Sequence, residues 1–322
     1  MTKYPSYVLT SKNGAEQHPF LKLFTFTVLF GLLFTSCQTK TNTTNLLRSK
    51  IEHIVSNKNA IVGVSILGNN GKDTLSLNGD RRFPMQSVFK LHIALAVLSE
   101  IDKGKLSLDQ TIEIGKDELL HADFWSPLRD ENPNGGSFTL EKLIQYTVSQ
   151  SDNTACDVLI QLIGTPKTVE EYIKKNHIQE IQITFNEVDM QAKWENMFQN
   201  WTTPKAASET LKVFYENKNK LLSKRSYDFF WKTNRETTTG TSRIKGQLPK
   251  ETIVAHKTGF SGTNKETGIT AAVNDIGIVF LPQDEYFIIS VFVTESMENM
   301  ETNEKIIADI AKATYDFYTS KK

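Results

Sequence analysis

Strand-like sequence occurs at the two ends of this chain and is scarce between them. Near the start, IVGVSIL (61–67) and DTLSLNG (73–79) flank Asn69–Lys72, whose Asn and Gly residues are typical of a hairpin turn. After Pro249 four more strand-like runs follow, namely TIVAHKTG, GITAAVN, IGIVFL and YFIISVFVT. A sheet is stable only when its strands pair and its apolar face is covered. We therefore expect an antiparallel five-stranded sheet built from both termini.

The intervening sequence has helical spacing. From Ser87 to about Trp231, apolar residues recur about every three or four positions, as in SVFKLHIALAVLSEI and TLEKLIQYTVSQS. Further helices are predicted over 45–57 and 304–318. We expect one α/β (α+β) domain over residues 45–320, with helices flanking the sheet. Its α/β part takes about 45–85 and 235–320, and an inserted all-helical part takes about 86–234.

Composition excludes several classes of protein. The 322 residues include Lys+Arg 37 and Asp+Glu 37, and this balance argues against a nucleic-acid partner, which requires a basic surface. Two cysteines, Cys37 and Cys156, are too few for a disulfide scaffold or a cysteine zinc site, and the six histidines lack metal-ligand spacing. We expect no metal or organic cofactor. We also expect a monomer.

The first 37 residues have the layout of a secretory signal. Basic residues precede the apolar run 20–36, and Cys37 follows directly. Phe34–Cys37 resembles the lipobox of bacterial lipoproteins, which implies a lipidated Cys37, a polar tether over 38–44 and a membrane-anchored periplasmic protein. Simple cleavage and an uncleaved anchor are the alternatives. The leader carries three Lys and one Glu, so the rest of the chain has a net charge of −2.

Ser87 and Lys90 form the first candidate catalytic pair. Ser87 opens an apolar helix behind Pro84, and residues three apart lie on one helix face, so the amine approaches the hydroxyl. A lysine whose pKa is lowered can act as the base that makes a serine nucleophilic. The N–H of Ser87 at the helix start is free to bind an oxyanion. The alternative is a helix cap followed by a surface lysine.

Ser151-Asp152-Asn153 lies between two helical segments. The Ser151 hydroxyl can relay a proton to a leaving group, and the Asn153 amide can bind a substrate amide or hold a lysine. The same three residue types are also favoured helix caps.

Lys257-Thr258-Gly259 lies in a strand pattern and precedes Phe260 and Ser261. Lys257 and Thr258 at a strand edge can bind a substrate carboxylate, and Gly259 gives a substrate backbone room to approach. The N–H of Phe260 is a candidate second oxyanion donor, and Ser261 follows it into the site. The alternative is an exposed edge strand protected by its lysine.

These three motifs, in this order, resemble those of the penicillin-recognising serine enzymes. Glu187 lies beyond Ser151 at the separation of the class A β-lactamase glutamate, which activates the water that hydrolyses the acyl-enzyme. The resemblance implies β-lactam substrates, with Ser87 as the nucleophile. Lys90, or Glu187 through a water, is then the acylation base.

Several positions depart from the usual class A pattern. Gln191 replaces a common Asn near the glutamate, and an Asp157–Asn200 hydrogen bond is expected to close the loop around it. Arg243 is expected to supply the cation that usually follows the KTG motif. Trp125 matches an aromatic position at the pocket mouth, or else is a core residue. The pattern resembles an extended-spectrum subgroup of Bacteroidetes.

Cephalosporinase or extended-spectrum hydrolysis is therefore the expected activity. Two alternatives remain, the first of which shares the first three motifs. One is a penicillin-binding DD-peptidase, which lacks the deacylating glutamate. The other is a non-catalytic lipoprotein that binds cell-wall material.

Overall fold

The computed structural model describes residues 44–320, and the predicted leader, tether and Cys37 lie outside them. By internal contacts the chain divides into Met1–Leu46 and Leu47–Lys322, and the description below concerns the second unit. No helix within residues 44–320 has both the length and the apolar character to cross a bilayer.

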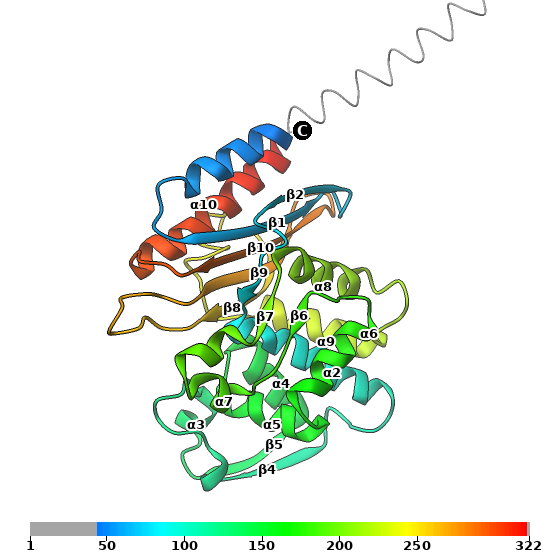
Figure 1. The fold of residues 1–322 in the computed structure, drawn as a ribbon. Coiled ribbons are helices and arrows are strands. Elements are labelled where there is room, and N and C mark those ends of the chain that lie inside the picture. The colour runs from blue at the N-terminus through cyan, green and yellow to red at the C-terminus, as the bar shows by residue number, and fades with distance from the viewer. Residues whose placement is uncertain (1–43, 321–322) are drawn as a thin grey trace, which may run out of the picture. The chain divides into compact units, whose positions relative to one another are not determined.

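A five-stranded antiparallel sheet joins the two ends of the domain, as predicted (Figure 1). Its strand order is β2-β1-β10-β9-β8. β10 is the central strand and pairs with β1, so that Val64 lies opposite Val291. The bounds are β1 Ile61–Gly68, β2 Asp73–Leu77, β8 Val254–Phe260, β9 Val273–Phe280 and β10 Tyr286–Thr294. β8, which carries the KTG motif, is an edge strand of this sheet.

The predicted strand GITAAVN (268–274) is only partly a strand. β9 begins at Val273, and upstream Thr270 forms isolated bridges to Thr263 and Ser296. The turn after β1 is as predicted, since Asn69, Asn70 and Gly71 all have positive φ.

Helices cover both faces of the sheet (Figure 1). A helix over 44–55 supplies Leu47 and Ile51, and α10 (Met300–Thr319) supplies Ile307, to an apolar cluster on one face. The other face packs against helices of the inserted part, whose bounds are α2 Phe89–Asp102, α3 Pro127–Glu131, α4 Leu140–Ser149, α5 Asn153–Ile163, α6 Pro166–Lys175, α7 Glu187–Gln191, α8 Pro204–Glu216 and α9 Lys224–Arg235.

The inserted part is not all-helical, which corrects the prediction. β4 (Thr111–Gly115) pairs with β5 (Gly135–Thr139). β7 (Trp201–Thr202) and β6 (Ile181–Gln182) form a second small sheet with β3 (Phe83–Pro84), which lies just before the inserted part. These strands have two to five residues each. Runs so short give too few alternations to distinguish a strand from a loop.

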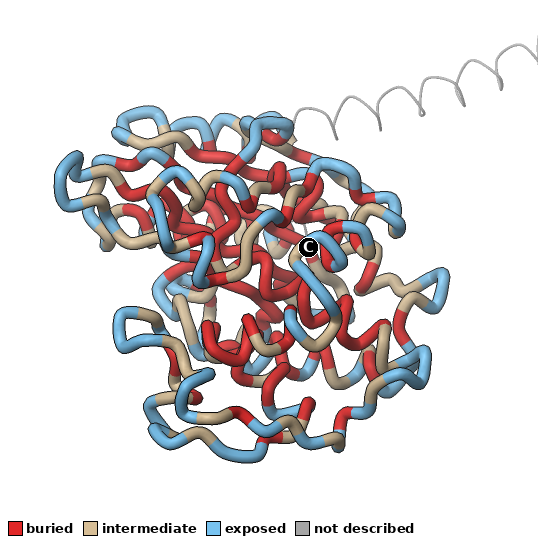
Figure 2. Tube along the Cα trace, turned by 60° about the horizontal axis from the view of Figure 1, so that its bottom comes forward, coloured by how far each residue is buried: buried red, intermediate tan, exposed pale blue. Residues whose placement is uncertain are grey.

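α2 is the central helix of the inserted part. All residues from Phe89 to Ser99 are buried, including Lys90. The helix is apolar on every side, as a helix surrounded by protein must be. In Figure 2 such buried segments occupy the interior, and exposed residues gather in the loops. The residue that precedes this rigid helix by two positions is Ser87.

Candidate active site

Ser87 lies in a single 3-10 turn, Gln86–Val88, directly before α2. Lys90 Nζ donates a hydrogen bond to Ser87 Oγ at 3.1 Å, which confirms the predicted approach. Gln86 has a φ of 46°, a left-handed conformation that is uncommon for a residue with a side chain. Asn274 Nδ2 of β9 donates to the carbonyl oxygens of Pro84 and Met85 and so holds the segment that leads into this turn.

Lys90 is fully buried and hydrogen-bonded on several sides, so it is not a surface lysine. Its Nζ donates to Ser151 O at 2.8 Å and to the Asn153 side-chain oxygen. Glu187 Oε1 lies 2.9 Å from the same nitrogen. A buried ammonium requires such partners, because desolvation without them strongly disfavours its charge. Lys90 therefore connects the Ser87 turn, the Ser151 segment and Glu187.

Ser151 and Asn153 face this lysine, whereas Asp152 has the capping role. Asp152 caps α5, and its carboxylate accepts hydrogen bonds from Ala155 N at 2.8 Å and Leu128 N at 2.7 Å. Ser151 has a φ of 61°, which directs the chain sharply into the helix. In this motif Asp152 is therefore the helix cap, whereas Ser151 and Asn153 belong to the site.

Lys257 lies on the edge strand β8 but is fully buried, so the protective surface-lysine alternative is wrong. Its Nζ donates to Ser151 Oγ at 2.9 Å and to Thr258 O at 3.0 Å. Burial, and then the charge of Lys90, hold the pKa of the Lys257 amine well below its usual value. Ser151 therefore has a lysine on each side.

The end of β8 supplies the expected free N–H. Ser261 N donates to Ala272 O of the neighbouring segment at 3.1 Å. Successive N–H groups of a strand point in opposite directions, so the N–H of Phe260 points away from β9. Gly259 is also required for packing, because a Cβ there would lie 2.5 Å from Met85 O. Only glycine lets β8 pack this closely against the Ser87 segment.

Arg243 approaches the KTG motif from a turn between α9 and β8. Its Nη1 donates to Gly259 O and Asn274 O, both at 3.0 Å, and its Nε lies 3.1 Å from Glu304 Oε1. Its Nη2 makes no hydrogen bond within residues 44–320. The guanidinium is thus fixed at one end of the site with one nitrogen free for a ligand.

Glu187 is buried at the start of α7, and Gln191 holds it one turn later. Gln191 Nε2 donates to Glu187 Oε2 at 2.9 Å. The Asp157 carboxylate accepts the backbone N–H groups of Glu187 at 2.8 Å and Val188 at 3.2 Å. Burial, with the nearby charge of Glu187, raises the pKa of the Asp157 carboxyl to about 7.

The predicted Asp157–Asn200 hydrogen bond is wrong. Asn200 Oδ1 instead accepts the backbone N–H groups of Thr184 and Phe185, and Nδ2 donates to Phe185 O. Both side chains stabilise the loop, but each binds a different stretch of its backbone. Residue spacing placed Asn200 at the C-terminal end of the loop and Asp157 six residues past Ser151. Spacing alone does not show which backbone groups lie opposite each side chain.

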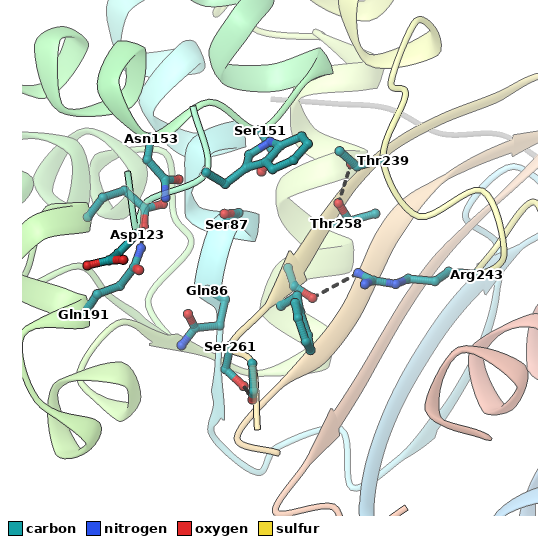
Figure 3. Close-up of a pocket in the computed structure, with 15 residues that line it drawn as sticks. Gln86, Ser87, Asp123, Ser151, Asn153, Gln191, Thr239, Arg243, Thr258 and Ser261 are labelled. Carbon is teal, nitrogen blue, oxygen red and sulfur yellow. Dashed lines mark hydrogen bonds between the residues drawn. The ribbon is translucent and has the colours of Figure 1, made fainter. Parts of the chain in front are cut away.

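These residues surround one cavity of about 330 Å³ (Figure 3). Eleven predicted residues line it: Ser87, Trp125, Ser151, Asn153, Glu187, Gln191, Arg243, Thr258, Gly259, Phe260 and Ser261. Lys90 and Lys257 are not among the lining residues. They donate hydrogen bonds to the lining residues Ser87 and Ser151, respectively. Within residues 44–320, no group of three His, Cys, Asp or Glu side chains is arranged to hold a metal ion.

The model of the β-lactamase enzyme family matches residues 46–318. The chain belongs to this family. It is 53% identical over 294 residues to β-lactamase VEB-1 of Pseudomonas aeruginosa, which spans 91% of this chain and 97% of that protein. The solved structure of TLA-1 extended-spectrum β-lactamase matches with a TM-score of 0.82 and 45% identity, over 85% of this chain and 99% of that one. A class A β-lactamase structure from Bacteroides cellulosilyticus matches with a TM-score of 0.81 and 38% identity, over 86% and 99%.

The fold and these relatives identify a class A serine β-lactamase, as the motifs indicated. In this β-lactamase Trp125 is 59% exposed, so the core-residue alternative is wrong. Its Nε1 donates to Gln150 O at 2.8 Å, which fixes the ring at the cavity.

Four residues of the cavity were not predicted from sequence: Gln86, Asp123, Thr239 and Gly262. The hydroxyl groups of Thr239 and Thr258 form a hydrogen bond with an O···O distance of 2.6 Å. Gln86 adjoins the Ser-Lys pair, and that adjacency was the one signal available for it. Asp123 and Thr239 lie in loops, where no periodic pattern indicates which side chains face inward.

Proposed function

We propose that this chain hydrolyses β-lactam antibiotics through an acyl-serine intermediate and thereby confers antibiotic resistance. The observation that carries the proposal is the position of Glu187, 2.9 Å from Lys90 Nζ, in the cavity that also contains Ser87. A carboxylate there can act in both acylation and deacylation, because Lys90 contacts the Ser87 hydroxyl as well as Glu187.

In acylation, Ser87 Oγ attacks the lactam carbonyl carbon and the C–N bond breaks. The Ser87 proton passes to Glu187 through a water, or to Lys90 after that ammonium has given a proton to Glu187. The N–H groups of Ser87 and Phe260 bind the oxyanion. Ser151, between two lysines, delivers a proton to the departing nitrogen.

In deacylation, Glu187 takes a proton from a water that attacks the acyl carbonyl. The ester bond then breaks, and Ser87 Oγ leaves with a proton that returns from Glu187 through Lys90. Gln191 holds Oε2 of this carboxylate and so orients it. The longer reach of Gln compared with Asn sets the water at a position particular to this branch of the family.

The substrate carboxylate is bound at the end of the cavity formed by Lys257, Thr258 and Arg243. Asn153 can hold the substrate amide through its side-chain nitrogen, because its oxygen already accepts from Lys90. Trp125, Gly259 and Ser261 complete the binding surface. The extended-spectrum name of TLA-1 supports cephalosporinase or extended-spectrum activity for this chain as well.

Turnover and mass spectrometry test the mechanism. Wild type should hydrolyse nitrocefin repeatedly, whereas Ser87→Ala should be inactive and form no adduct. Glu187→Ala should form an adduct that persists. A stable adduct in wild type would instead indicate a DD-peptidase. If wild type matches Ser87→Ala in every assay, with neither hydrolysis nor an adduct, the protein is non-catalytic.

We also propose that residues 1–37 direct export to the periplasm, that Cys37 is lipidated, and that the mature protein is a monomer. Labelling with a radioactive fatty acid should mark wild type but not Cys37→Ser. The unlabelled variant should move from the membrane fraction to the soluble periplasmic fraction. Light scattering of residues 45–320 should give the mass of one chain.

A further inference from the structure

We propose that the cavity is polarised in charge along its length, and that Asp123 makes it selective for β-lactams whose acyl side chain carries an ammonium group. This inference rests on the proposed function, because it concerns which substrates the same cavity prefers. It identifies Asp123 as a specificity-determining residue.

The two ends of the cavity differ in charge. Figure 3 shows Arg243, Thr239 and Thr258 on one side of Ser87, and Asp123 with Gln191 on the other. Three of the lining residues have acidic or basic side chains, namely Asp123, Glu187 and Arg243. Glu187 is compensated by Lys90 at 2.9 Å. Arg243 pairs with Glu304 through Nε at 3.1 Å, but its Nη2 has no hydrogen-bond partner in residues 44–320. Arg243 and Asp123 are therefore the charged lining groups left to contact a ligand at the two ends.

Binding of the substrate carboxylate near Arg243 decides the orientation of the rest of the molecule. The lactam carbonyl must lie at Ser87, so the acyl side chain extends towards the opposite end, where Asp123 lies. A substrate with a carboxylate at one end and a cation at the other matches both charges.

The Asp123 carboxylate is open to such a cation. Its side chain is 87% exposed and contacts His121 Nδ1 at 2.9 Å. No lysine or arginine in the described part of the chain forms an ion pair with it. The charge is therefore presented to the cavity rather than neutralised by a neighbouring cation.

The neighbouring groups favour an ammonium over a neutral substituent. Gln191 uses its amide nitrogen on Glu187, which leaves its carbonyl oxygen as an acceptor. Trp125 lines the same cavity with a ring that is 59% exposed and held through Nε1. A cation is attracted to the face of such a ring, and an aromatic substituent stacks on it. The matching substrate class is the α-amino-aryl penicillins and cephalosporins.

Ampicillin and benzylpenicillin test this directly, since they differ only by the α-ammonium group. Asp123→Asn should lower the ratio of kcat/KM for ampicillin to that for benzylpenicillin by about two- to five-fold, the range of an exposed charge pair. The effect should decrease as salt is added. Asp117→Asn, which removes an exposed acid outside the cavity, should leave the ratio unchanged. An equal ratio in wild type and Asp123→Asn overturns the proposal.

Binding without turnover separates this proposal from the catalytic one. In a Ser87→Ala background, Asp123→Asn should weaken ampicillin binding relative to benzylpenicillin by a similar factor. If wild type hydrolyses neither penicillin but the two dissociation constants differ as expected, the proposed function fails and the selectivity stands. If Asp123→Asn changes the dissociation constants of ampicillin and benzylpenicillin by the same factor, the proposed selectivity is wrong, whether or not wild type hydrolyses them.

Discussion

At the scale of single residues, the site places two lysines around one serine and the buried carboxylate of Glu187 against one of them. Lys90 and Lys257 both contact Ser151, and Glu187 contacts Lys90. Lys257 has its pKa lowered well below its usual value by burial and by Lys90. An amine in this state releases a proton more readily, which suits a relay through the Ser151 hydroxyl.

Gln191 is expected to act as a positioning residue for Glu187. Gln191→Met keeps the length of the side chain but removes the donor to Glu187 Oε2. We expect deacylation to slow by about ten-fold, the effect of losing one hydrogen bond to a charged group. Mass-spectrometric timing of the acyl-enzyme measures this rate. A rate equal to that of wild type, at unchanged melting temperature, would show that Gln191 does not orient the carboxylate.

Arg243 is expected to contribute to substrate binding. Arg243→Ala should raise KM for carboxylate-bearing β-lactams by about ten-fold, because a charge-assisted hydrogen bond is lost. Glu304→Gln, the control, removes the acid 3.1 Å from Arg243 Nε and should lower KM slightly. Steady-state kinetics measure both. The assignment is wrong if the two variants shift KM in the same direction.

At the scale of elements, the loop that carries Glu187 is held by the side chains of Asp157 and Asn200, which hydrogen-bond to its backbone. Asp157 on α5 accepts two N–H groups at the start of α7, and Asn200 binds Thr184 and Phe185. Both side chains are buried. The loop is therefore fixed to the core, and these hydrogen bonds also fix the position of Glu187.

Asp157 should make stability depend on pH. Its folded pKa of about 7 exceeds the unfolded value of 3.8, so the folded state binds the extra proton between these pH values. The free energy of unfolding should then fall as pH rises from about 4 to about 7, on the order of a few kcal/mol. Asp157→Asn should remove this slope. Urea unfolding of both proteins across that range provides the measurement, and parallel curves would contradict the prediction.

At the scale of the whole domain, the sheet joins residues that are far apart in sequence. β1 pairs with β10, and the KTG strand β8 lies at the edge beside the Ser87 turn. Arg243 and Asn274 bridge the sheet to that turn. The active site thus forms only when both parts of the domain are folded.

Residues 45–320 are expected to suffice for folding and catalysis. All the described site residues lie within this range. When expressed without residues 1–44, the domain should retain kcat/KM within about two-fold and one cooperative unfolding transition, because one sheet is shared by the apolar clusters on its two faces. Nitrocefin hydrolysis and calorimetry measure the two quantities. A lower activity together with a second transition would show that the boundary is misplaced.

The sequence by itself determined the local features of this protein. The proximity of Ser87 and Lys90 follows from one helical turn, and the strand at Lys257 follows from a short strand-like run, because both depend on only a few neighbouring residues. The order of the motifs was sufficient to indicate the family. The sheet from both termini was predictable too, since unpaired strands cannot be buried.

Only the tertiary structure decided how these segments meet. It brought Lys257 to Ser151, gave Asp157 and Asn200 separate partners, and placed Asp123 at the cavity. It also decided that Gly259 is needed for close packing against Met85. Such contacts depend on the burial and approach of segments distant in sequence. That burial lowers the pKa of Lys257 and raises that of Asp157, and no local pattern encodes it.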